Sequence, residues 1–244
     1  MVQNTVIWNL NVPSMKKLLP LALAILVLAA CNTPRNTTIS EDMDFSYLAL
    51  GDSYTIGEGV PLNEAWPVQL VERLKERNFK VAPPLIIART GWTTRNLITN
   101  IESDVNVQRK FDLVSILIGV NNQYQGKPAS EFEVELEEIF RKAINHSKTK
   151  EQGVFALSIP DYGVTPFGSR NADTIAVQID RFNAIVKRVA EQYNVDFYNI
   201  TPISREALVD KSLIARDSLH PSGEMYRAWV DEIIDEVAGK LTQP

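Results

Sequence analysis

Residues 51–59 place a serine on a glycine-rich turn directly after an apolar segment. Segment 45–50 has the character of a strand, and the run GDSYTIGEG follows it at once. A strand that ends in such a turn holds the backbone of Ser53 still while it presents the hydroxyl to solvent. A serine hydroxyl is a weak nucleophile by itself, so chemistry at Ser53 requires a base, an acid that orients the base, and donors for an oxyanion. Without those partners Ser53 would be an ordinary turn serine.

The chain offers two histidines as the base, His146 and His220. His146 ends a glutamate-rich helical segment, where the helix dipole alone favours a histidine. His220 precedes Pro221, which disfavours helical geometry before it and begins a helix well, so His220 is expected on a loop. Asp217 can accept a hydrogen bond from one imidazole nitrogen and leave the other to face Ser53. We predict that His220 is the base and Asp217 its orienting acid, although this spacing also fits an ordinary capping carboxylate.

Three groups are candidates for an oxyanion hole. They are the backbone amides of Ser53 and Gly91 and the side-chain amide of Asn121. Gly91 allows close approach of a ligand because it has no Cβ, and Asn121 follows a predicted buried strand. Taken singly, Gly91 and Asn121 also fit ordinary turn positions.

These positions follow the order serine, glycine, asparagine, histidine, and they resemble the motif blocks of the SGNH hydrolases, also called the GDSL esterase and lipase family. Ser53 matches the nucleophile block and Gly91 the glycine block. Asn121 matches Gly-x-Asn-Asp, and Asp217 with His220 matches Asp-x-x-His. The resemblance implies a three-layer α/β/α, flavodoxin-like fold, no metal or organic cofactor, and hydrolysis of carboxylic esters through an acyl-enzyme.

Two positions depart from the family pattern within the matched span, roughly residues 45–237. Tyr54 stands where the name-giving leucine of Gly-Asp-Ser-Leu would be, and Asn122 replaces the aspartate of Gly-x-Asn-Asp. Neither position carries the chemistry. We expect Tyr54 to alter the lip of the pocket and Asn122 to affect a supporting hydrogen bond.

The elements that must position these residues are those of a parallel sheet covered by helices. Short apolar segments alternate with longer segments of helical period, which is typical of α/β proteins. Five segments have the unbroken apolar character of strands buried on both faces, namely 45–50, 84–89, 112–118, 153–159 and 195–200. Ligands bind beyond the carboxyl ends of such strands. The sequence therefore predicts a five-stranded parallel sheet with the site at that rim.

Apolar residues with helical spacing predict helices over segments 132–144, 175–189 and 225–237. In the first of these, the glutamates fall mostly outside the apolar stripe, and we expect them to form a solvated face. They are Glu131, Glu133, Glu135, Glu137 and Glu138. No internal repeat interrupts the chain after residue 44, so we expect one folded domain.

The first thirty residues have the pattern of a secretory signal. A short basic segment at Met15, Lys16 and Lys17 leads into an apolar run that ends at Ala30. This run is shorter than the roughly 20 residues of a permanent membrane helix. It ends in LAAC at Cys31, which resembles the lipobox of bacterial lipoproteins, in which the cysteine is lipidated and becomes the new N-terminus. A chance cysteine after an apolar run is the alternative.

This pattern gives an expected division of the chain. Residues 1–30 would be a lipoprotein signal peptide, 31–43 a polar tether, and 44–244 the hydrolase domain, with translation beginning at Met1 or Met15. The mature protein would be exported and attached to the membrane of the bacterial cell envelope by a lipid on Cys31. Cys31 is the only cysteine, so an internal disulfide is excluded.

The net charge of −5 argues against a nucleic-acid partner, because phosphate binding needs a basic face. Removing a signal peptide that contains two lysines and no acid would make the chain still more acidic.

The substrate is left open by the residues that follow the strands. Five aromatic residues could line an acyl pocket, form a platform for sugar rings, or pack within loops, namely Tyr54, Trp92, Tyr124, Tyr162 and Phe167. We favour small acyl esters, including acetyl groups on glycans, over lysophospholipids or thioesters. The competing class is a noncatalytic surface lipoprotein that binds glycan through the same cleft.

Overall fold

A five-stranded, all-parallel sheet forms the centre of the domain in the computed structural model, which describes residues 43–107 and 109–242. The strand order is β2-β1-β3-β4-β5. The strands are β1 (Tyr47–Gly51), β2 (Leu85–Ala88), β3 (Leu113–Leu117), β4 (Val154–Leu157) and β5 (Asp196–Tyr198). All five predicted strands are confirmed, each within two residues at its ends.

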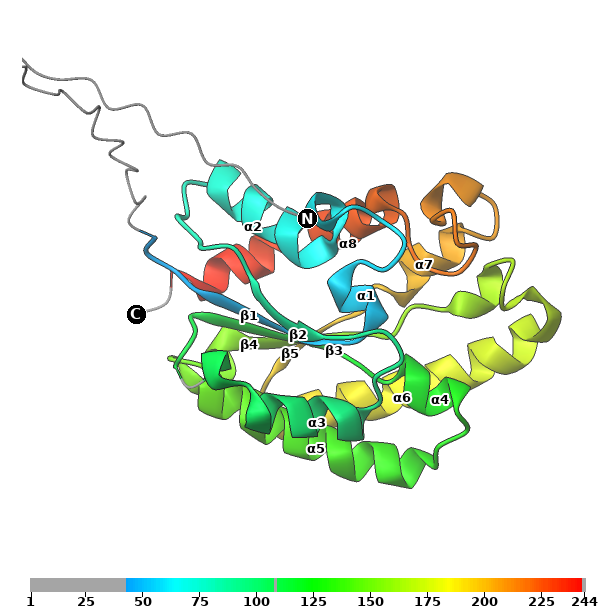
Figure 1. The fold of residues 1–244 in the computed structure, drawn as a ribbon, viewed down its shortest axis with the longest axis horizontal. Helices are drawn as coiled ribbons and strands as arrows, with labels where there is room; N and C mark the ends of the chain where they lie inside the picture. The colour runs from blue at the N-terminus through cyan, green and yellow to red at the C-terminus, as the bar shows by residue number, and fades with distance from the viewer. Residues whose placement is uncertain (1–42, 108, 243–244) are drawn as a thin grey trace, which may run out of the picture. The chain divides into compact units, whose positions relative to one another are not determined.

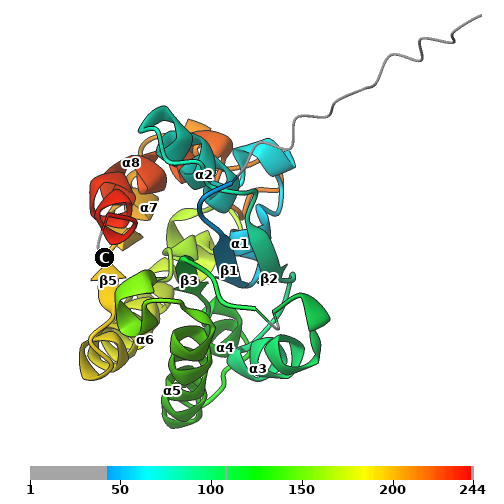
Figure 2. The same cartoon turned by 90° about the vertical axis from the view of Figure 1, so that its left-hand side faces the viewer.

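Helices cover both faces of the sheet and make three layers (Figures 1 and 2). Helices α2 and α8 lie on one face, and α3, α5 and α6 lie on the other. The helices are α1 (Ser53–Ile56), α2 (Trp66–Glu76), α3 (Thr94–Ser103), α4 (Val120–Tyr124), α5 (Ala129–His146), α6 (Ala172–Gln192), α7 (Thr201–Glu206) and α8 (Gly223–Lys240). The predicted α/β/α, flavodoxin-like class is thus confirmed, and the three predicted helices lie within α5, α6 and α8.

Burial explains why the inner strands are apolar throughout. Every residue of β1, β3 and β4 is buried, because each of these strands has a strand on both sides and helices above and below. The edge strands β2 and β5 are only partly buried. Around the sheet, the apolar stripes of α5, α6 and α8 close the core.

One prediction about the helices was wrong. Glu135 was expected on the solvated face of α5, but only 3% of it is exposed. Its carboxylate accepts hydrogen bonds from the Thr94 hydroxyl and from Arg95 Nε, both at the start of α3. A buried carboxylate needs such partners, and the apolar period of α5 could not show them because they come from another helix.

The strand order reverses direction at β1, which has β2 on one side and β3 on the other. Gly51 at the end of β1 pairs with Ala88 and with Leu117, so the three strands end at the same level. Parallel sheets bind ligands in the crevice at such a reversal. Whatever follows these three strands is therefore brought together at one rim.

Candidate active site

Ser53 lies at the first position of α1, directly beyond the end of β1. The turn is tight: a Cβ on Gly51 would come within 2.1 Å of Thr55 Oγ1 and 2.5 Å of the Leu117 carbonyl oxygen. The side chain of Asp52 caps α1 by accepting the Tyr54 N–H at 3.1 Å. The turn thus fixes the backbone of Ser53 from both sides.

Asp52 is a buried carboxyl next to the candidate nucleophile. Burial raises its pKa from 3.8 to about 7, and hydrogen bonds from the backbone N–H groups of Tyr54 and Gly119 offset this rise only in part. One of its oxygens, Oδ2, has no partner among the side chains and backbone of the described residues. Asp52 is therefore close to the balance between its neutral and charged forms at neutral pH.

His220 is held by the loop that leads into α8. Its Nδ1 lies 2.6 Å from Asp217 Oδ2, while Asp217 Oδ1 accepts the backbone N–H groups of Leu219 and His220, each at 2.9 Å. The loop is closed by the Ala215 N–H, which donates to the His220 carbonyl at 2.8 Å. Ser222 then caps α8 by accepting the Met225 N–H.

The electrostatics of Asp217 suit it to orient a histidine. Its burial alone would raise the pKa of the carboxyl, but the hydrogen bonds from the His220 ring and from the backbone of His220 and Leu219 outweigh burial and lower the pKa below its ordinary value. Asp217 therefore stays ionised at neutral pH. A charged acceptor at Nδ1 fixes the proton on that nitrogen and leaves the other nitrogen free to act as a base.

Gly91 and Asn121 follow β2 and β3 and face the same space. Gly91 has a φ of +81°, and a Cβ there would meet nothing within 4 Å, so its conformation rather than crowding favours glycine. Asn121 Nδ2 donates one hydrogen bond to the Trp92 carbonyl at 3.0 Å. An amide nitrogen carries two donors, so this bond aims the group and leaves its second N–H for a ligand.

Asn122, which replaces the family's aspartate, makes its supporting hydrogen bonds. Its Oδ1 accepts the Thr94 N–H at 3.0 Å and its Nδ2 donates to Thr94 Oγ1 at 2.6 Å. The Thr94 hydroxyl in turn donates to Glu135. This network of Thr94, Asn122 and Glu135 ties the start of α3, just after Gly91, to α4, which carries Asn121.

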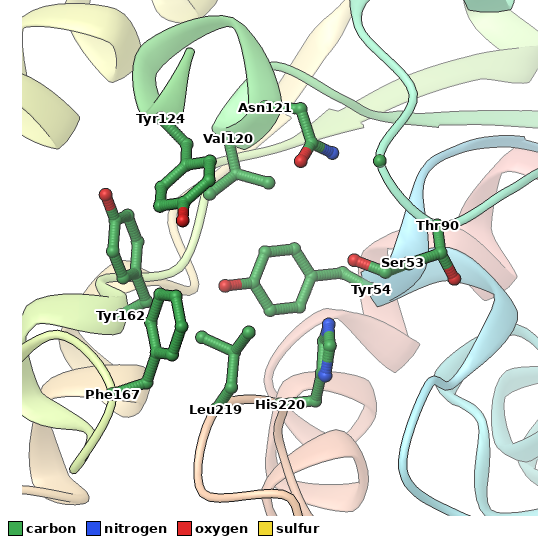
Figure 3. A pocket seen from close by; sticks show the side chains of 11 residues that line it. Ser53, Tyr54, Thr90, Val120, Asn121, Tyr124, Tyr162, Phe167, Leu219 and His220 are labelled. Carbon is green, nitrogen blue, oxygen red and sulfur yellow. The ribbon is translucent and has the colours of Figure 1, made fainter.

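The predicted residues border one cavity of about 150 Å³ (Figure 3). Figure 3 shows a ring nitrogen of His220 pointing toward Ser53. The lining residues are Ser53, Tyr54, Thr90, Gly91, Val120, Asn121, Tyr124, Tyr162, Phe167, Leu219 and His220. Asp217 stands behind His220 through its hydrogen bond. The cavity therefore gathers a hydroxyl, an imidazole and two candidate oxyanion donors from four separate loops.

Other predicted residues lie elsewhere. Of the five aromatic candidates, Trp92 does not line this cavity. His146 lies near the N-terminal ends of the strands, away from the cavity, since its carbonyl accepts the N–H of Phe111, two residues before β3. Cys31, the predicted lipidation site, falls outside the described residues.

Gly59 makes a close approach to Asp217 that was not predicted from the sequence. It has a φ of +84°, and a Cβ there would come within 2.8 Å of Asp217 Oδ2. The backbone after the nucleophile helix thus packs directly against the acid that holds His220. Two glycines so close together, at 57 and 59, were the available signal of a close approach.

Within residues 43–107 and 109–242, no group of three or more histidine, cysteine, aspartate or glutamate side chains is placed to hold a metal ion. None of the helices in the same part of the chain is long and apolar enough to cross a membrane.

Comparisons with known proteins add a family and a shared fold. The model of the GDSL-like lipase/acylhydrolase family matches residues 49–228. The structure of TesA matches with a TM-score of 0.64 at 18% identity, covering 80% of this chain and 99% of that one. No curated protein sequence matches the chain.

Two further solved structures share the fold. The esterase EstA from Pseudoalteromonas sp. matches with a TM-score of 0.60 at 20% identity, over 82% of this chain and 100% of that one. The acetylxylan esterase Axe2 from Geobacillus stearothermophilus matches with a TM-score of 0.59 at 22% identity, over 83% and 96% of the two chains.

Proposed function

Since the chain belongs to the GDSL-like lipase/acylhydrolase family and is an ester hydrolase, we propose that it removes small acyl groups, such as acetyl groups on glycans, through an acyl-enzyme on Ser53. The observation that carries this proposal is the shared cavity. Ser53, Gly91, Asn121 and His220 all border it, and Asp217 is bonded to the remaining ring nitrogen of His220.

In the first half of the reaction, Ser53 Oγ attacks the ester carbonyl carbon as the free nitrogen of His220 takes the hydroxyl proton. Asp217, which is ionised, stabilises the imidazolium that forms. The carbonyl oxygen becomes an oxyanion and accepts hydrogen bonds from the Ser53 and Gly91 amides and from the second N–H of Asn121. The C–O bond of the alcohol then breaks, and His220 returns its proton to the leaving oxygen.

In the second half, water attacks the acyl group on Ser53. His220 takes a proton from the water, the same three donors hold the second oxyanion, and the carboxylic acid leaves as His220 returns the proton to Ser53 Oγ. Histidine suits both transfers because its ordinary pKa lies near neutrality. These residues, the ester and one water molecule account for every bond and proton in the two halves.

The size of the cavity favours a short acyl group. It holds about 150 Å³, and the rings of Tyr124, Tyr162 and Phe167 stand at the side away from Ser53 (Figure 3). These rings contact one another with centroids 5.9–6.3 Å apart, as aromatic clusters do. A long acyl chain would have to displace them.

The outer surface of the same rings favours a sugar. Tyr124 and Phe167 are 59% and 51% exposed. They border a second hollow of about 360 Å³ that carries amide and hydroxyl side chains, among them Asn171, Thr174 and Gln178. Exposed aromatic faces beside amides and hydroxyls suit the apolar ring faces and hydroxyls of sugars. Axe2, which shares the fold, is an acetylxylan esterase.

The test compares three variants for hydrolysis of 4-nitrophenyl acetate and for labelling by a fluorophosphonate. Ser53→Ala should abolish both, and His220→Ala should lower both by at least about 10³-fold, because each removes a member of one catalytic unit. His146→Ala is the matched control, since it removes the other histidine, and it should keep wild-type rates. Equal turnover by the wild type and Ser53→Ala would overturn the mechanism.

The substrate class is tested by competition among natural esters. We expect release of acetate from acetylated xylo-oligosaccharides to exceed, at equal concentration, the hydrolysis of lysophosphatidylcholine and of palmitoyl-coenzyme A. A preference for either long-chain substrate would overturn the small-acyl proposal and support a lysophospholipase or a thioesterase.

A further inference from the structure

Tyr54 reaches from the nucleophile turn into the cavity. It is the second residue of α1, only 3% exposed, and it lines the cavity beside Ser53. Its ring stands edge-on to the His220 ring, with centroids 5.6 Å apart, and also to Trp229, at 6.5 Å. These contacts fix the direction of the side chain. Figure 3 shows its hydroxyl pointing away from Ser53, into the space among Tyr124, Phe167 and Leu219.

The groups around Ser53 leave this space for the acyl chain. In the tetrahedral intermediate the oxyanion must face Gly91 and Asn121, and the leaving oxygen must face His220, which protonates it. The carbon chain of the acyl group is the remaining substituent. It therefore extends between Val120 and Leu219 and meets the Tyr54 side chain at its far end.

The Tyr54 side chain also borders two cavities. A smaller one, of about 10 Å³, lies deeper and is bordered by Asp161, Thr165 and Ser204. Both cavities share Tyr54, Tyr162, Leu219 and His220 as lining residues. A shorter side chain at position 54, such as the leucine typical of the family's motif, would not reach across this boundary, and the cavity would extend inward.

The Tyr54 hydroxyl has no hydrogen-bond partner among the described residues, although the ring below it is buried. A phenol can donate one hydrogen bond and accept another. An apolar chain pressed against it would remove water from the hydroxyl and supply no partner, which is unfavourable. An acyl group short enough to stop before it, or one with a polar end, avoids this cost.

We propose that Tyr54 sets the acyl specificity: its ring ends the acyl pocket after a short chain, and its hydroxyl gives that end a hydrogen-bonding group. The pocket then accepts acetyl groups and short acyl groups with a terminal hydroxyl, and it rejects longer alkyl chains. This inference rests on the proposed esterase function and adds the residue that selects the acyl group.

The experiment measures kcat/KM for 4-nitrophenyl esters from acetate to octanoate with the wild type, Tyr54→Leu and Tyr54→Phe. The wild type should prefer acetate to octanoate by about 100-fold or more, and Tyr54→Leu should reduce that ratio by at least about tenfold, in line with the discrimination that pocket size gives. Tyr54→Phe retains the ring that ends the pocket, so it should still prefer short chains and should lose only the part of the preference that comes from desolvating the hydroxyl.

The hydroxyl is tested with the 4-nitrophenyl esters of butyrate and of 3-hydroxypropionate, in which a terminal hydroxyl replaces the terminal methyl group of butyrate. The wild type should favour the hydroxylated ester, and Tyr54→Phe should lose at least about tenfold of that preference. Tyr198→Phe is the matched control, because its hydroxyl also has no partner among the described residues, but Tyr198 lies on β5 and does not line the cavity. It should keep the wild-type preference. This arm does not depend on the folding of Tyr54→Leu, which is monitored by its unfolding midpoint.

The outcomes separate this inference from the proposed function. Hydrolysis that depends on Ser53, combined with an unchanged chain-length ratio in folded Tyr54→Leu and an unchanged hydroxyl preference in Tyr54→Phe, would overturn the role of Tyr54 and leave the esterase intact. Hydrolysis by the wild type that does not depend on Ser53 would overturn both.

Discussion

At the scale of single residues, Asn121 illustrates how one bond can prepare a group for catalysis. One N–H of its amide is held by the Trp92 carbonyl, so the other is aimed before substrate arrives. Donors that are oriented in advance stabilise the negative charge of the transition state and do not have to reorient during the reaction. We predict that Asn121→Ala lowers kcat for 4-nitrophenyl acetate by about 10²- to 10³-fold while KM changes little.

Gln125 supplies the matched control for Asn121. It caps the C-terminal end of the same helix, and its amide nitrogen lies 3.4 Å from the Gly91 carbonyl oxygen, but it does not line the cavity. Gln125→Ala should keep kcat within about threefold of the wild type. If both alanine variants lose activity equally, the amide of Asn121 has no special role in binding the oxyanion.

We propose that Gly59 affects the reaction through Asp217 rather than through contact with the substrate. In Gly59→Ala the new methyl group would collide with Asp217 Oδ2 at 2.8 Å and displace the acid that holds His220. We predict a loss in kcat of about 10- to 100-fold, because small misplacements of catalytic groups are costly. Steady-state kinetics with 4-nitrophenyl acetate measures this loss.

Gly126→Ala separates the collision from backbone strain. Gly126 also has a positive φ, +67°, but a Cβ there would meet nothing within 4 Å. Its alanine variant should lose stability, by about 1 kcal/mol, and keep wild-type kcat. An equal loss of kcat in both variants would show that Gly59 does not act through Asp217.

At the scale of elements, Asp52, which caps helix α1, makes the stability of the protein depend on pH. Burial raises its pKa from 3.8 to about 7, so folding takes up a proton between these values. The free energy of unfolding must therefore fall as the pH rises through this range, and level off above it. Asp52→Asn takes up no such proton, and its amide oxygen can still accept the Tyr54 N–H. We predict that the free energy of unfolding of the variant, taken relative to that of the wild type, rises by up to about 4 kcal/mol from pH 4 to pH 8.

Urea unfolding at intervals across this range measures the effect. Asp210→Asn is the control, because Asp210 caps a turn in the same way but is exposed, and hydrogen bonds from Ser212 lower its pKa. The stability that Asp210 contributes is lost only as the pH falls below the ordinary pKa of its carboxyl. The free energy of unfolding of Asp210→Asn, plotted against pH, should therefore run parallel to that of the wild type above pH 4. A parallel curve for Asp52→Asn would contradict the prediction.

The network of Thr94, Asn122 and Glu135 explains why this chain has an asparagine where the family has an aspartate. The Thr94 hydroxyl has one proton and gives it to Glu135, so the group at position 122 must donate. Asn122→Asp would bring a second carboxylate to the same proton. We predict a loss of about 1–3 kcal/mol in the free energy of unfolding.

A double-mutant cycle tests this account. In Asn122→Asp combined with Glu135→Gln, the glutamine donates to Thr94 and the Thr94 proton passes to Asp at position 122. The double variant should therefore recover at least half of the stability lost by Asn122→Asp. Purely additive losses in urea unfolding would rule out the exchange.

The same elements show what the sequence could predict. The five strands were predictable because burial on both faces leaves unbroken apolar segments such as 112–118, and the rim follows from the chemistry of parallel sheets. The burial of Glu135 was not, because its partners are on α3. Gly59 likewise matters only through Asp217, a residue distant in sequence. Contacts between elements leave no periodic signal in either one.

At the scale of the whole molecule, the start of the described chain lies at the N-terminal ends of the strands, and the site lies at their C-terminal ends. The chain enters β1 at Tyr47 and reaches the rim at Gly51, and a strand rises about 3.3 Å per residue. The chain before residue 43 is therefore joined to the domain at the N-terminal end of β1, the end away from Ser53.

From the lipobox-like ending LAAC at Cys31, we propose that the protein is exported and anchored by a lipid on Cys31. When the full chain is expressed in a bacterium, the protein should sediment with membranes and take up labelled fatty acid. Cys31→Ser should take up no label and leave the membrane fraction, because a covalent lipid stabilises membrane association by about 0.8 kcal/mol for each buried CH₂.

Because Cys31 precedes the polar tether and the domain, kcat/KM of the released protein for 4-nitrophenyl acetate should match that of the anchored form. Sedimentation of Cys31→Ser with membranes as complete as that of the wild type would contradict the anchor, and a changed kcat/KM would contradict its independence from the site.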